Sequence, residues 1–305
     1  VNTVSTTVND PNTGLTALGN SVVANTTKVA GASATEIGYL SGVTSSIQTQ
    51  INTLSSGAAT DINSLSDAKI TIQDSTFYLG NIPANSTGKN NTAVGITNLK
   101  SNTSGYDNVA IGKDALKTNT TGYENTAVGY NSLMLNTTGN TNTAIGERAL
   151  EDNTTGSRNT AVGAWTIDHN TTGDYNTALG YAALTANTTA DNNTAVGYAS
   201  LYDNTTGTDN VGMGWWSLTE NTSGSNNTGM GSQSGKSNTT GSNNTNIGFK
   251  SGYSNTTGSG NVFIGYKAGF NETTSNKLYI ANGTADSNLS LIHISEPTRP
   301  ERIAY

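Results

Sequence analysis

A glycine recurs every 17 residues in this chain, eleven times from Gly95 to Gly265, without an insertion or a deletion. Around each glycine a short motif repeats, as in Asn125-Thr126-Ala127-Val128-Gly129. A short period kept without insertions is typical of solenoids, in which each repeat forms one coil and stacked coils share a core. The chain is therefore expected to form an extended, regular array, whose function is to be sought on its surfaces.

Two columns of apolar residues define the expected coil. The residue before each glycine is Val, Ile, Leu or Met, and the residue two positions earlier is mostly Thr or Val. In a strand these two side chains share a face, so both are expected to point into the coil. A second column, Leu or Ile, follows four residues after the glycine from Leu99 to Leu218, and an Asn-Thr-Thr-Gly turn comes next.

These columns predict an all-β, parallel β-roll or β-solenoid of eleven 17-residue coils over residues 77–288. Each coil is expected to contain two short strands and two turns and to rise about 4.8 Å along the axis. Eleven such coils give a rod on the order of 50 Å long. After Leu218 the second column becomes Gly235, Gly252 and Gly269, which predicts narrower coils at that end.

Between the two expected inward positions, seven successive repeats carry alanine. We expect these side chains to point outward, where a small and uncharged face suits close packing between identical chains. The alternative is that small residues merely suit a flat strand. The predicted chain–chain interface is formed by Ala93, Ala110, Ala127, Ala144, Ala161, Ala178 and Ala195.

Residues 1–76 lack the 17-residue period. Ser33 and Glu36 form a capping-box pattern, which marks the start of a helix. Apolar residues at helical spacing follow, which predicts an N-terminal stalk with short coiled-coil helices. A helix that packs on the end of the solenoid is the alternative. The apolar positions are Leu40, Val43, Ile47, Ile51 and Leu54, then Ile62, Leu65 and Ile70.

The C-terminal segment differs from everything before it. Residues 289–299 resemble the translation of a transposon-type sequencing adapter. We interpret residues 289–305 as an adapter-derived artefact and leave them out of the fold prediction. Because the chain also starts at Val1 without an initiator Met, we expect it to be a fragment of a protein that continued beyond Asn288.

Composition limits the classes of function. The chain has 305 residues and a net charge of −7, which disfavours binding to nucleic acid, because that binding depends on Lys and Arg. It contains no cysteine, so disulfides and thiolate metal sites are excluded. Membrane insertion is not expected either, since no apolar run approaches the roughly 18 residues of a membrane span.

The sequence offers no catalytic constellation, and no enzyme activity, metal site or cofactor is predicted. His169 occupies a turn position that other repeats fill with varied residues, so we expect it on the surface. Carboxylates fall at variable sites without a recurring pair that could serve acid–base catalysis. They include Asp114, Glu147, Asp168 and Glu220.

Asparagine recurs at two positions of the repeat. The Asn four residues before each glycine, as in Asn125, is expected to form a stacked ladder. The turn Asn lies in an Asn-x-Thr or Asn-x-Ser sequon, which turn geometry alone explains, so we expect these sites to be unmodified. Examples are Asn102, Asn119, Asn136 and Asn153.

The residue after the glycine is often aromatic, as at Tyr130 and Phe249. Aromatic rings with a polar handle form platforms for sugars and anchors for interfaces. The alternative is an aromatic stack that covers the edge of the coil. The candidate contacts for a glycan or receptor are Tyr181, Tyr198, Trp215 and Trp216.

The repeat motif, for example Asn142 to Gly146, resembles the repeats of trimeric autotransporter adhesin heads, although their period is shorter. The segments Ala34 to Gln50 and Ser275 to Asn282 are similar to segments of phage tail-fibre proteins. The resemblance implies a left-handed roll with three identical chains side by side. It also implies a structural and adhesive role in a phage tail fibre or a cell-surface adhesin, on the virion tail or outside the cell.

Two alternatives to this interpretation remain. One is a receptor-binding head that recognises glycans. The other, from a different class, is an ice-binding solenoid, suggested by the Thr ranks. It is disfavoured here because Thr103 and Thr120 fall in turns, while alanine is expected at the outward strand position.

Overall fold

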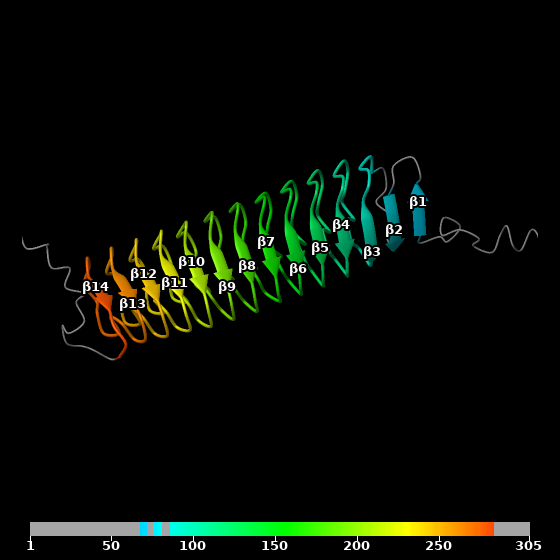
Figure 1. Ribbon diagram of the computed structural model, residues 1–305. Coiled ribbons are helices and arrows are strands. Elements are labelled where there is room, and N and C mark those ends of the chain that lie inside the picture. The colour runs from blue at the N-terminus through cyan, green and yellow to red at the C-terminus, as the bar shows by residue number, and fades with distance from the viewer. Residues whose placement is uncertain (1–67, 72–75, 81–85, 284–305) are drawn as a thin grey trace, which may run out of the picture. The chain divides into compact units, whose positions relative to one another are not determined.

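The computed structural model of the chain describes residues 68–71, 76–80 and 86–283 (Figure 1). The contacts divide the chain into two units, residues 1–65 and residues 66–305. The first unit and residues 289–305 lie outside the described residues, as do the predicted coiled-coil helices up to Leu65. Ile70, which we placed in a helical spacing, lies in a strand.

The described part of residues 66–305 is a β-solenoid, as predicted. Its fourteen strands form one sheet in which neighbours in sequence are neighbours in space. The first pair is antiparallel and all later pairs are parallel. The strands are β1 (Ala68–Thr71), β2 (Thr76–Gly80), β3 (Thr92–Gly95), β4 (Val109–Ile111), β5 (Thr126–Val128), β6 (Thr143–Ile145), β7 (Thr160–Val162), β8 (Thr177–Leu179), β9 (Thr194–Val196), β10 (Val211–Met213), β11 (Thr228–Met230), β12 (Thr245–Ile247), β13 (Val262–Ile264) and β14 (Leu278–Ile280).

The coils from β3 to β13 stack in register, and about eleven coils spaced 17 residues apart are confirmed. Ala127 of β5 pairs with Ala144 of β6, so the register advances by one repeat at each step. Figure 1 shows the strands from β3 to β13 as successive rungs, each joined to the next by a long loop.

Each coil contains one strand rather than the two that we predicted. The Leu column lies in a turn, where Leu116 and Leu133 have φ angles of 49°. A positive φ is uncommon outside glycine and bends the chain too sharply for a strand. This turn still bonds to its neighbours in the stack, since Leu116 N–H donates to Ser132 O at 3.1 Å.

The alanine column faces the inside of the coil, and our prediction of an outward interface there is wrong. Ala127 is fully buried within the single chain, whereas Thr126 and Val128 on either side of it are partly exposed. Leu133 fills the coil from the opposite wall and is also fully buried, which leaves space for only a methyl group on the strand. The corrected residues are Ala93, Ala110, Ala127, Ala144, Ala161, Ala178 and Ala195, all 0% exposed.

The repeating glycine is required by the stack. Gly146 has a φ of +134°, and a Cβ atom on it would lie 2.5 Å from the carbonyl oxygen of Gly163 in the next coil. Any side chain would therefore push two coils apart as well as strain the backbone. This explains why the glycine recurs without exception.

Two buried asparagine ladders run along the solenoid, and the predicted ladder is confirmed. Asn142 N–H donates to Asn125 Oδ1 at 3.0 Å, and Asn125 Nδ2 donates to Gly139 O at 2.9 Å. The sequon residues form the second ladder, in which Asn136 Nδ2 donates to Asn119 Oδ1 at 2.8 Å. Asn119 and Asn136 are 0% exposed, so a glycan cannot be attached there in the folded chain.

Candidate functional site

A slot opens on the solenoid where the second residue after the glycine changes size. In four successive coils this position holds Trp165, Ala182, Ala199 and Trp216. All four residues have positive φ angles, between 49° and 61°, so the backbone is the same and only the side chains differ. The two alanines leave a gap of about 390 Å³ between the tryptophans.

Aromatic rings and hydroxyl groups line this slot. Tyr181 and Tyr198, directly after their glycines, stack with centroids 5.4 Å apart and an angle of 11° between the rings. Thr185, Tyr202 and Thr219, five residues after their glycines, also line the gap. Every residue that lines the slot is uncharged, and Tyr181 and Tyr198 are about half exposed.

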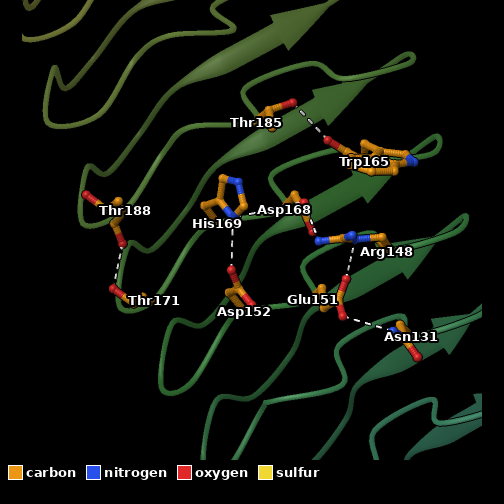
Figure 2. Close-up of polar contacts among 10 residues, drawn as sticks. All are labelled: Asn131, Arg148, Glu151, Asp152, Trp165, Asp168, His169, Thr171, Thr185 and Thr188. Carbon is orange, nitrogen blue, oxygen red and sulfur yellow. Dashed lines mark hydrogen bonds and ion pairs between the residues drawn. The ribbon is translucent and has the colours of Figure 1, made fainter.

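Trp165 is held in place by the coil that precedes it. The guanidinium carbon of Arg148 lies 4.3 Å from the centroid of the Trp165 ring. Arg148 pairs with Glu151, and its Nη2 lies 3.3 Å from Asp168 Oδ2 (Figure 2). Asn131 Nδ2 in turn donates to Glu151 Oε1 at 2.9 Å. This network fixes the arginine and so the ring above it.

Asp168 is the buried charge of this network. Its side chain is 0% exposed, and its Oδ1 has no hydrogen-bond partner. Burial raises the pKa of the Asp168 carboxyl to about 6, although Arg148 and His169 lower it. His169 is exposed, as predicted, and its Nδ1 lies 2.9 Å from Asp152 Oδ2.

The other end of the slot is supported by aromatic and charged neighbours. Trp216 stacks on Trp215 with centroids 4.5 Å apart and an angle of 9° between the rings. From the following coil, Lys236 Nζ lies 5.6 Å from the centroid of Trp216 and is bound to Glu220 Oε1. Each tryptophan of the slot thus contacts a paired cation from the coil that lies away from the gap.

The structure brings together three of the four predicted contact residues. Tyr181, Tyr198 and Trp216 line the slot, and Trp215 supports it through stacking. Sequence reasoning did not place Trp165 or Tyr202 among the contacts. The sequence does contain a signal for this site: the second residue after the glycine is Trp in one coil, Ala in the next two and Trp again in the fourth.

A second surface is the outward face of the strands. The residue before each repeating glycine is exposed or partly exposed, contrary to our prediction that it points inward. In the strands from β3 to β13 the buried residue is the alanine or its equivalent in the middle of the strand, as in β6 and β8. This face carries no charged side chain from β3 to β13. Its exposed large apolar residues are Ile111, Ile145, Leu179, Met213, Met230 and Ile247.

The same face carries a column of threonines. Thr143 is partly exposed and Thr177 is exposed, and they stand two residues before the aliphatic column. One of our two reasons for disfavouring an ice-binding surface was an outward alanine, and that reason is wrong. In most coils, the two outward side chains of the strand are a Thr and, two residues later, an aliphatic residue.

Among the described residues, no group of three acidic or histidine side chains could hold a metal ion. The described part of the chain also contains no helix with the length and hydropathy needed to cross a membrane. Comparisons with models of protein families, with curated proteins and with solved structures find no match to this chain.

Proposed function

We propose that the chain is a non-enzymatic, structural and adhesive segment of a fibre, in which identical chains associate through the outward strand face. The observation that carries this proposal is the aliphatic column of that face, in which Leu179 remains 50% exposed and Ile145 41% exposed. A row of exposed aliphatic side chains is typical of an interaction surface.

The occupant that fits this face is a second copy of the chain. The face has no charged side chain, so it cannot form ion pairs with a charged partner. Its threonine and aliphatic columns also repeat at each coil. A copy aligned along the same axis meets an equivalent side chain at every step and buries the whole face. In line with the resemblance of the repeats, the proposed assembly is a homotrimer in a phage tail fibre or a cell-surface adhesin.

Two neighbouring residues of β6 provide a matched test. Ile145→Glu places a charge on the outward face and should leave the coil folded but dissociate the assembly. Ala144→Glu places the same charge in the core and should unfold the coil. Sedimentation velocity and circular dichroism separate the two results. A wild-type chain that sediments as a monomer at all concentrations would contradict the proposal.

An ice-binding surface is a second candidate, favoured by the outward threonine column. Stacked parallel strands place these threonines about 4.8 Å apart in a straight row, which is a regular array of hydroxyl and methyl groups. Thermal hysteresis and ice recrystallisation assays on the wild type and on Thr143→Lys test this function. Without activity in the wild-type chain, whether monomeric or assembled, this candidate is rejected.

A further inference from the structure

We propose that the slot between Trp165 and Trp216 binds a neutral glycan, whose sugar rings lie against the tryptophan and tyrosine side chains. None of the residues that line the slot belongs to the aliphatic and threonine columns of the strand face, so the proposed association of chains does not use them. Nine residues line the slot: Trp165, Tyr181, Ala182, Thr185, Tyr198, Ala199, Tyr202, Trp216 and Thr219.

The chemistry of the lining fits the faces of pyranose rings. A pyranose presents axial C–H groups on its faces and hydroxyl groups at its edge. Aromatic rings attract these C–H groups because the ring face is electron-rich, and Trp165 and Tyr198 remain 37% and 48% exposed as residues. The phenol groups of Tyr181, Tyr198 and Tyr202 can donate and accept hydrogen bonds at the sugar edge.

The dimensions of the slot suit a short oligosaccharide. A volume of about 390 Å³ lies within the range of small-molecule sites. Trp165 and Trp216 stand three coils apart, which is about 14 Å along the axis. The stacked rings of Tyr181 and Tyr198 span the two coils between them, so the slot runs along the solenoid and a glycan chain would follow the same direction.

The charges around the slot select a neutral ligand. No lining residue is charged, and the cations that contact the two tryptophans are already paired. Arg148 pairs with Glu151 and Asp168, and Lys236 pairs with Glu220. The chain as a whole carries a net charge of −7, which repels polyanions. Sulfated and uronate-rich glycans are therefore poor ligands for this site.

Tryptophan fluorescence provides a direct measurement, because all three tryptophans of the chain lie in or beside the slot. The probes are cellohexaose, chitohexaose and mannohexaose as neutral oligosaccharides, with sulfated dextran as the anionic comparison. We expect a saturable change in emission with at least one neutral probe and none with sulfated dextran. Isothermal titration calorimetry then gives the dissociation constant.

A blocking variant tests the place of binding. Ala182→Trp with Ala199→Trp fills the slot, and the backbone accepts tryptophan there, since Trp165 and Trp216 occupy the same column with similar φ angles. The matched control is Gln233→Trp, in the same column with a φ of 58° but outside the slot. The blocking variant should weaken binding at least tenfold, and the control should leave it unchanged.

Three results would overturn the proposal. The first is the absence of binding to every neutral probe, and the second is binding to sulfated dextran alone. The third is binding to a neutral probe with equal affinity in the wild type and the folded blocking variant, which would place the ligand elsewhere. Circular dichroism establishes that both variants are folded.

Discussion

Phe263 occupies the space that a side chain at Gly269 would need, since a Cβ atom on Gly269 would lie 2.5 Å from Phe263 Cδ1. In the central coils a large Leu in the turn faces a small Ala on the strand. Near the C-terminus the sizes are exchanged, with a fully buried Phe on the strand and Gly in the turn. The interior of the β13 coil therefore stays filled although this coil lacks the Leu of the central coils.

This exchange predicts a compensating pair of substitutions. Phe263→Ala should leave a cavity and destabilise the C-terminal coils by about 3–5 kcal/mol. Gly269→Leu alone should clash with the phenyl ring. The double variant recreates the Leu and Ala arrangement of the central coils, so it should recover part of the lost stability. Hydrogen exchange over residues 245–283 measures the effect, and a double variant less stable than both single variants would contradict it.

The glycine column predicts a second result. Gly146→Ala forces a methyl group against Gly163 O and strains a residue with positive φ, so it should cost at least about 2 kcal/mol of local stability. The control is Glu147→Ala, on the exposed side chain that follows Gly146 in the same coil. Thermal unfolding should show a clear loss for the first variant and almost none for the second. Equal melting temperatures for the Gly146 variant and its control would contradict the prediction, because the coils would then accommodate the added methyl group without a loss of stability.

The buried asparagine ladder predicts a third result, a local loss of stability when one of its amides is removed. Asn125→Ala removes the acceptor of Asn142 N–H and the donor to Gly139 O, and unpaired buried groups cost about 1–3 kcal/mol each. Thr121→Ala, on an exposed side chain in the same repeat, is the control. Hydrogen exchange should become faster in the two coils beside Asn125. Unchanged exchange would mean that water replaces the amide.

The period of the sequence was sufficient to predict the solenoid, the coil count and the ladder at Asn125. It was not sufficient to decide which side of the strand faces inward. Thr126 and Val128 share a face, but alternation does not say whether that face or the one with Ala127 is buried. The answer depends on the width of the coil, which is set by Leu133 at a positive φ that the residue type does not predict.

The slot was predicted only in part for a related reason. Tyr181 and Tyr198 were evident because they repeat directly after the glycine. A cavity, however, is defined by the side chains that are small as well as by those that are large. Ala182 and Ala199 carry no functional group, and their importance follows only from their place between two tryptophans in one column.

The buried carboxyl of Asp168 predicts a pH dependence of stability. Its pKa is raised from 3.8 to about 6 in the folded chain, so between these values the folded state holds a proton that the unfolded state has lost. The free energy of unfolding therefore falls as the pH rises from about 4 to about 6, and above that range this penalty stays constant.

Asp168→Asn removes the titrating group while it keeps an acceptor for Arg148, so the variant should be more stable than the wild type at pH 7.5. The expected difference is roughly 1–3 kcal/mol, and it should shrink toward zero as the pH is lowered to 4. Asp152→Asn makes the same change of charge at a side chain that is 37% exposed, and it should produce a much smaller effect. Chemical denaturation of the three proteins at several pH values provides the measurement. If Asp168→Asn is less stable than the wild type at pH 7.5, the ion pair with Arg148 outweighs the cost of burying the charge.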